Sequence, residues 1–184
     1  MSWILTHTGK HFDFMNIDPD EIDMQDIAVS LAREPRFGGH TEEFYSVAQH
    51  SVLASLIVPP GYEFEALLHD ATEAYCRDIP SPLKRLLPDY QDMERKIDLA
   101  VRTRFNLPPE MSANVKLADK ILLAAELRDL MPDDPDKLEA LEGLVPMADS
   151  TIDRIIPVDS TRARSMFLCR WMDILNKEIR VVGR

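Results

Sequence analysis

The chain has 184 residues, a length typical of one domain, and 45% of them are hydrophobic, so it can bury a substantial core. Its 32 acidic residues against 21 Lys and Arg give a net charge of −11, which excludes a general binder of duplex nucleic acid, because such proteins present a basic surface. Two cysteines without a CxxC spacing exclude a zinc ribbon, and the absence of a signal-like or 20-residue apolar run predicts a cytoplasmic protein that does not enter membranes.

The first predicted element is a small β-hairpin over residues 3–14, WILTHTGKHFDF, in which two apolar stretches flank Thr8-Gly9-Lys10. Apolar residues at helical spacing then predict six helices, at residues 24–33, 44–58, 63–75, 89–105, 112–130 and 161–179. Prolines at positions 80 and 82 leave room only for a short helical turn before Leu87.

These elements predict one all-α domain covering residues 1–184, with the hairpin, residues 1–14, at its start. The segment 132–157 is acidic and punctuated by prolines, so we expect it to be a mobile surface loop with a short helix near 138–144. No repeat or domain boundary is visible in the sequence.

Four side chains are candidate metal ligands: His50, the adjacent pair His69 and Asp70, and Asp119. Each is expected within an apolar helix, where a polar or charged group needs a partner, because burying it alone is costly. One divalent cation could satisfy all four, and imidazole and carboxylate groups suit Zn, Co, Mn or Fe. Each residue alone would more often be an ordinary helix residue, and only the ordered set favours a metal site.

Glu73 follows His69 by four residues and Asp70 by three, so on one helix it would share their face. A carboxylate there that is not itself a ligand could orient or deprotonate a water molecule, or protonate a leaving oxygen.

Phosphate binding would need cations in this acidic chain. Lys116 lies one helical turn before Asp119, Lys84 lies in the PSPLK turn, and Arg36 lies in the loop before the first candidate ligand. For Lys84 a solvated surface position is an equal alternative. His40, after paired glycines, is either a polar contact in the pocket or an ordinary loop histidine.

The order His50, His69-Asp70, Asp119 resembles the HD-domain metal-dependent phosphohydrolases. The strings YSVAQHSV, ALLHDATEAY, RDIPSPLK and VKLADK are similar to the branch that contains the YfbR-type 5′-deoxynucleotidases and related phage deoxynucleoside triphosphohydrolases. The resemblance runs from about Phe12 to Leu130 and implies a single HD-domain helical bundle.

The resemblance also implies roles for individual residues. It assigns metal ligation to His50, His69, Asp70 and Asp119. It implies that Glu73 acts beside the metal-bound water and that Asp78 lies near the nucleophile and the deoxyribose. Arg77 departs from the pattern, because glycine usually precedes the acid at that position.

Arg36 and Phe37 occupy the place of an Arg-Trp pair in that branch, where the arginine contacts phosphate and the ring lies against the sugar. The ring would disfavour a 2′-hydroxyl, although Phe37 is smaller than Trp. With these two residues, His40, Lys84 and Lys116 form the expected substrate-binding set.

The expected activity is that of a metal-dependent phosphoric ester hydrolase, with a slight preference for a 5′-deoxynucleotidase that releases phosphate from deoxynucleoside monophosphates. The same skeleton would serve a deoxynucleoside triphosphate triphosphohydrolase. A non-catalytic nucleotide-binding HD module and a helical interaction domain are the competing hypotheses. We expect one divalent metal ion (Co, Mn, Zn or Mg) as cofactor, a small-molecule deoxynucleotide as substrate, and a homo-oligomer of at least two chains.

Overall fold

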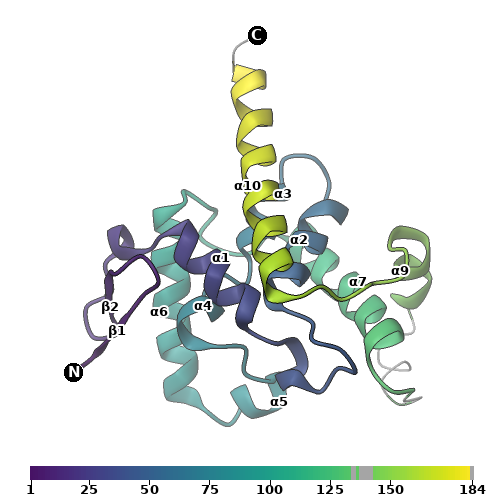
Figure 1. The fold of residues 1–184 in the computed structure, drawn as a ribbon, viewed down its shortest axis with the longest axis horizontal. Coiled ribbons are helices and arrows are strands. Elements are labelled where there is room, and N and C mark those ends of the chain that lie inside the picture. The colour runs from purple at the N-terminus through teal and green to yellow at the C-terminus, as the bar shows by residue number, and fades with distance from the viewer. Residues whose placement is uncertain (134–135, 137–142, 183–184) are drawn as a thin grey trace.

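The computed structural model describes residues 1–133, 136 and 143–182 of the chain. It is mostly helical, with a small antiparallel sheet near the N-terminus, as the sequence predicts (Figure 1). The helices are α1 (Met24–Arg33), α2 (Val47–Ile57), α3 (Glu63–Leu68), α4 (Glu73–Cys76), α5 (Ser81–Lys84), α6 (Pro88–Arg104), α7 (Ala113–Leu130), α9 (Val145–Thr151) and α10 (Ser160–Val182), with 3-10 helices η1 (Pro19–Glu21) and η2 (Arg36–Gly39). Within the described part of the chain, none of these helices is both long and apolar enough to cross a membrane.

The predicted hairpin is confirmed: β1 (Trp3–Leu5) pairs antiparallel with β2 (His11–Asp13). Its turn is fastened to α1, because the backbone N–H and the hydroxyl of Thr8 each donate a hydrogen bond of 2.7 Å to the Asp26 carboxylate. Phe12 is fully buried and stacks on the Tyr75 ring, with 4.2 Å between the ring centroids. The hairpin therefore packs against α1 and α4.

Side-chain caps account for the helix starts. Asp23 caps α1 by accepting a hydrogen bond from the Gln25 N–H, and the predicted range 24–33 is confirmed. Ser46 caps α2, which therefore begins at residue 47 and not at the predicted residue 44. Ser112 caps α7, as the sequence predicts.

The predicted single helix over 63–75 is wrong. The chain leaves α3 after Leu68 and forms a turn before α4, so the His69-Asp70 pair lies in that turn and not within a helix. At the break, His69 Nδ1 lies 2.7 Å from the Ala66 carbonyl oxygen, the acceptor that an uninterrupted helix would offer to the Asp70 N–H.

The segment 132–157 contains α9, and the residues after it cross the surface of α2. The side-chain amide of Gln49 binds this segment through two hydrogen bonds. Its NH₂ group donates to the Ile156 carbonyl at 2.8 Å, and its oxygen accepts from the Val158 N–H at 3.0 Å. Most of the helix expected near 138–144 lies outside the described residues, and the mobility of the segment stays a prediction.

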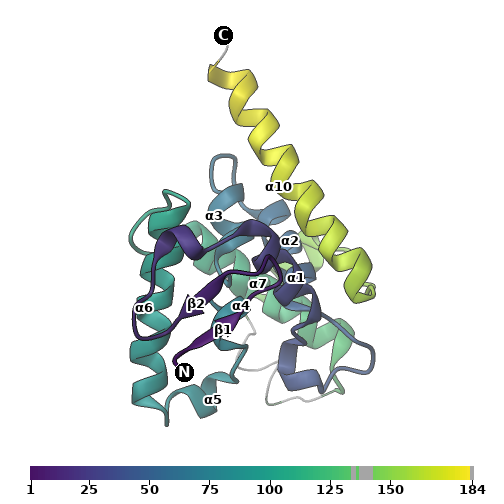
Figure 2. The ribbon, with the colours of Figure 1, turned by 60° about the vertical axis from the view of Figure 1, so that its left-hand side comes forward.

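The main core lies between the hairpin, α1, α2, α3, α6 and α10, with Phe12, Leu31, Leu67, Ile97 and Phe167 among its buried side chains. Both views show α10 running across the body and extending beyond it at its C-terminal end (Figures 1 and 2). A second core joins α2 to α7 and α9. Helix α2 is therefore clamped from two sides, which fixes the position of His50.

Candidate metal centre

Three separate elements bring the four predicted ligands together. His50 comes from α2, His69 and Asp70 from the turn between α3 and α4, and Asp119 from α7. The Nε2 atom of His50 lies 3.2 Å from His69 Nε2, 3.2 Å from Asp119 Oδ1 and 3.4 Å from Asp70 Oδ2. His69 Nε2 lies 3.1 Å from Asp70 Oδ2 and 3.8 Å from Asp119 Oδ1.

The outward nitrogens of both imidazoles are occupied by other partners. His50 Nδ1 lies 2.6 Å from Glu126 Oε1, and His69 Nδ1 lies 2.7 Å from the Ala66 carbonyl. Metal-binding histidines show this arrangement, in which one nitrogen donates to an oxygen acceptor and the other faces the ion. His50, His69 and Asp119 offer ligand atoms within 4.8 Å of one another and could hold a metal ion. Asp70 Oδ2 faces the same two imidazoles.

The electrostatics of this cluster favour a positive charge at its centre. Burial and the Arg36 charge oppose protonation of His50, but Glu126, Asp119 and Asp70 outweigh them and raise its pKa well above the usual range. Burial likewise opposes protonation of His69, yet the neighbouring carboxylates raise its pKa to about 9. The same carboxylates would stabilise a bound cation.

The two aspartates show the complementary effect. Burial tends to raise the pKa of Asp70, but the charges and hydrogen bonds of His69 and His50 lower it well below the usual range. The pKa of Asp119 is lowered in the same way, by hydrogen bonds from both imidazoles that outweigh burial. Both carboxylates are therefore ionised at neutral pH and available to a cation.

Glu73 begins α4 and lies in the same cavity as His69 and Asp70, although the helix breaks between them. Its side chain is buried, and among the described residues its Oε2 has no hydrogen-bond partner. Burial, together with the charges of Asp70 and Asp78, raises the pKa of Glu73 well above its usual range. A buried carboxyl that holds its proton here can act as an acid.

Asp78 follows a strained residue. Burial raises the pKa of its carboxyl, and the Arg36 charge partly opposes this effect. Its backbone N–H donates to Glu34 Oε1 at 3.3 Å. The preceding residue, Arg77, has φ +78° and ψ 156°, a conformation natural to glycine, and its guanidinium binds Glu34 Oε2 at 2.7 Å.

The two residues of the predicted Arg-Phe pair lie together at the edge of the cluster. Arg36 Nη1 lies 3.7 Å from Asp70 Oδ2, and the guanidinium carbon lies 5.5 Å from the centre of the Phe37 ring. Phe37 has φ +54°, a left-handed conformation followed by Gly38 in the same region. His40 is exposed at the end of this turn, and within the described residues the structure gives it no contact with the cluster.

The cavity beside the cluster has a volume of about 450 Å³. Lys84 and Lys116, the two lysines expected to bind phosphate, both line it. Lys84 lies 2.6 Å from Glu94 Oε1, whereas exposed Lys116 has no ion pair within residues 1–133, 136 and 143–182. The cavity is also lined by His69, Asp70 and Glu73, by Arg102 and other residues of α6, and by residues 109–111, which precede α7.

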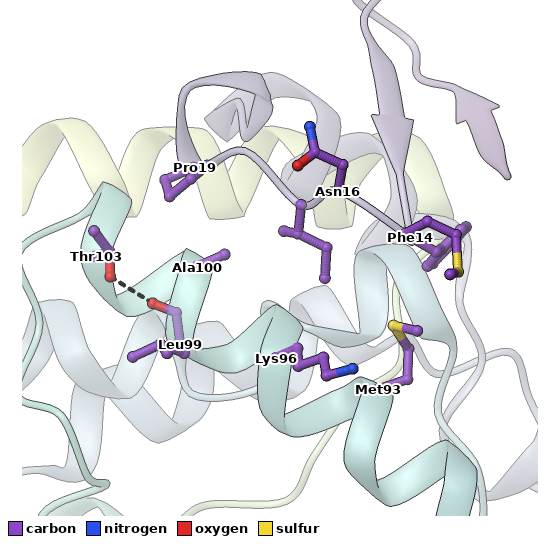
Figure 3. Close-up of a pocket in the computed structure, with 10 residues that line it drawn as sticks. Phe14, Asn16, Pro19, Met93, Lys96, Leu99, Ala100 and Thr103 are labelled. Carbon is purple, nitrogen blue, oxygen red and sulfur yellow. Dashed lines mark hydrogen bonds between the residues drawn. The ribbon is translucent and has the colours of Figure 1, made fainter.

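A cavity of similar size, about 430 Å³, lies elsewhere, between α6 and the residues after β2 (Figure 3). Met93 and Leu99 line it from α6, and Phe14 lines it from the opposite side. It contains none of the candidate ligands, so it is separate from the site described here.

Sequence reasoning missed Glu126. This residue is fully buried in α7 and contacts both His50 and Arg36. It lies seven residues after Asp119, two helical turns away on the same face of the helix, but this spacing alone does not distinguish it from an ordinary acidic helix residue.

No protein-family model matches the chain. It is 53% identical over 174 residues to the uncharacterized protein YfdR of Escherichia coli (strain K12), an alignment that covers 95% of this chain and 96% of the relative. It is also 33% identical over 129 residues to the uncharacterized protein RCAP_rcc00048 of Rhodobacter capsulatus. That alignment covers 65% of this chain and 66% of the relative. With such identity over almost its whole length, the chain belongs to the same protein family as YfdR of Escherichia coli.

Proposed function

We propose that the chain is an HD-domain, metal-dependent phosphohydrolase that acts as a 5′-deoxynucleotidase on deoxynucleoside monophosphates. The observation that supports this most is the meeting of His50, His69, Asp70 and Asp119 beside the buried Glu73 carboxyl. A module that only binds a nucleotide would not need a buried carboxyl group beside the candidate metal ligands.

The four candidate ligands would hold one divalent ion, and the two imidazole nitrogens favour Co, Mn or Zn over Mg. Such an ion supplies Lewis acidity, which activates water and offsets charge on a phosphoryl oxygen. The raised pKa of both imidazoles, caused by the surrounding carboxylates, fits a place built for positive charge.

Two residues of the chain, Glu73 and Asp78, would donate and accept the protons that the hydrolysis requires. Water attacks phosphorus, and the bond between phosphorus and the 5′-oxygen breaks, so that the leaving oxygen needs a proton. Burial and the charges of Asp70 and Asp78 raise the pKa of Glu73, which favours its protonated form, and that form can donate a proton to the leaving oxygen. Asp78, whose charge influences Glu73, can accept the proton that the attacking water loses.

The charges around the cavity favour a monophosphate over a triphosphate. Lys84 is paired with Glu94, and Arg102 is paired with Asp98 at 2.8 Å. Lys116 is the cavity lysine without an ion pair in the described part of the chain. Three phosphates would need several free cations, whereas a single phosphate needs fewer, and Lys116 can supply one.

The test is a panel of deoxy- and ribonucleoside mono- and triphosphates, assayed with Co, Mn, Zn or Mg and followed by product analysis. The expected products are inorganic phosphate and a deoxynucleoside from the monophosphates. Release of intact triphosphate would replace this proposal with a triphosphohydrolase, and nucleotide binding without turnover would replace it with a non-catalytic module. Light scattering of the same sample tests the expected homo-oligomer.

A further inference from the structure

Glu126 uses its two carboxylate oxygens on two different parts of the site. Oε1 lies 2.6 Å from His50 Nδ1, and Oε2 lies 2.9 Å from Arg36 Nη2. The side chain has no exposed surface, so water does not compete for either oxygen. A candidate metal ligand and a candidate phosphate-binding residue are thus held by one buried carboxylate.

Arg36 has a second carboxylate within reach. Its Nη1 lies 3.7 Å from Asp70 Oδ2, a candidate metal ligand, and Asp70 Oδ2 in turn lies 3.4 Å from His50 Nε2. The contacts therefore close a ring from Glu126 through His50, Asp70 and Arg36 back to Glu126. The shorter distance shows that Glu126, and not Asp70, is the main partner of the guanidinium.

We propose that Glu126 is a positioning residue that couples metal binding to phosphate binding, and this inference rests on the proposed function. On the metal side it sets the tautomer and orientation of His50. On the phosphate side it holds Arg36 at 2.9 Å and so limits the contact of Arg36 with Asp70 to 3.7 Å.

The first role follows from imidazole chemistry. A neutral imidazole carries one N–H, and a carboxylate at Nδ1 accepts it there, which leaves the Nε2 lone pair directed at His69, Asp70 and Asp119. Loss of such an outer carboxylate typically weakens metal affinity by about 10- to 100-fold.

The second role follows from the position of Arg36. Without the Glu126 charge, Asp70 is the other carboxylate of the described residues within 4 Å of the guanidinium, and Arg36 would compete with a cation for it. An Arg36 bound to Asp70 would also be withdrawn from phosphate. Metal and phosphate should therefore strengthen each other's binding by the same factor in the wild-type protein, because linkage is reciprocal.

The test titrates the full-length, metal-stripped protein with Co²⁺ and follows its absorption, which needs no turnover. Glu126→Gln keeps the side-chain shape and should weaken Co²⁺ binding by about 10- to 100-fold. Glu65→Gln is the matched control, because Glu65 is also buried and lies 3.8 Å from an arginine, Arg102, but contacts none of the candidate ligands. Its Co²⁺ affinity should equal that of the wild type.

Arg36→Met separates the two roles. In the Glu126→Gln background it should restore part of the lost Co²⁺ affinity, because the competitor for Asp70 is gone, while the His50 defect remains. Calorimetric titration of the Co²⁺-loaded proteins with inorganic phosphate should show weakened binding in Glu126→Gln and no weakening in Glu65→Gln. If Glu126→Gln is unfolded by circular dichroism, Glu126→Asp, which keeps the charge but is shorter, takes its place.

Equal Co²⁺ affinity of folded Glu126 variants and the wild type would overturn the inference and leave the proposed function standing. Metal binding that depends on Glu126 in a protein that hydrolyses no nucleotide would support the inference and overturn the proposed function. A wild-type protein that binds no Co²⁺, Mn²⁺ or Zn²⁺ would overturn both.

Discussion

Replacing Arg77 tests whether the turn before Asp78 stores backbone strain. At φ +78° and ψ 156°, a residue with a Cβ atom pays about 1–3 kcal/mol that glycine avoids. Glycine also raises the conformational entropy of the unfolded chain, which lowers the free energy of unfolding by about 0.4–1 kcal/mol relative to alanine. Arg77→Gly should therefore be more stable than Arg77→Ala by roughly 1–2 kcal/mol.

Comparing the two variants with each other removes the contribution of the Arg77–Glu34 ion pair, because both lose it. Urea unfolding followed by circular dichroism measures the difference, which corresponds to a melting shift of roughly 2–4 °C per kcal/mol for a chain of this length. Position 95, in the middle of α6, is the control. In an ordinary helix the Arg95→Ala variant should be more stable than the Arg95→Gly variant by about 1 kcal/mol. If alanine is the more stable residue at position 77 as well, the strain argument is refuted.

Three further predictions concern the site. His69→Ala and Asp70→Ala should each abolish bound metal and activity, as measured by elemental analysis and phosphate release. Glu73→Ala should retain metal and nucleotide but turn over about 10²- to 10⁴-fold more slowly, because it loses proton transfer and keeps the ligands. The wild type should prefer deoxynucleotides by about tenfold to hundredfold, since a ribose hydroxyl against the Phe37 ring would lose its water without gaining a partner. Phe37→Ala should relax this preference, chiefly by raising kcat/KM for ribonucleotides.

Each of these predictions has a distinct contrary result. Stoichiometric metal in either ligand variant would remove that residue from the centre. Loss of metal from Glu73→Ala would make Glu73 a ligand, and an unchanged kcat would remove it from the mechanism. A lower melting temperature of Phe37→Ala with an unchanged deoxy-to-ribo ratio would show that the ring only packs beneath its loop.

Local signals were sufficient to predict most helices. The cap at Ser112 marks the start of α7, and Pro35 follows the end of α1, because both act on the backbone within a few residues. The hairpin was predictable for the same reason, since apolar residues flank a turn with Gly9 at φ +85°. The four candidate ligands were chosen from their order in the sequence, and the structure brings their side chains close together.

The bend at His69 and the role of Glu126 were not readable from the sequence. Hydrophobic periodicity continues through residues 63–75, yet the helix breaks where the His69 side chain lies against the Ala66 carbonyl, because tertiary contacts can override local helix propensity. Glu126 resembles any acidic residue of an amphipathic helix until Arg36, 90 residues earlier, is placed beside it. Contacts across such distances along the chain leave no mark in local spacing.

The position of α10 has a consequence for biosynthesis. The candidate ligands have all left the ribosome once Asp119 has emerged, yet Ala163, Phe167 and Ile174 of α10 belong to the same buried core as Leu67. A nascent chain that ends near residue 130 would expose the apolar faces of α1, α2 and α3 that α10 covers. The candidate metal centre should therefore become rigid only after translation is nearly complete, and prematurely terminated chains should be substrates for chaperones or proteases while carrying all four candidate ligands.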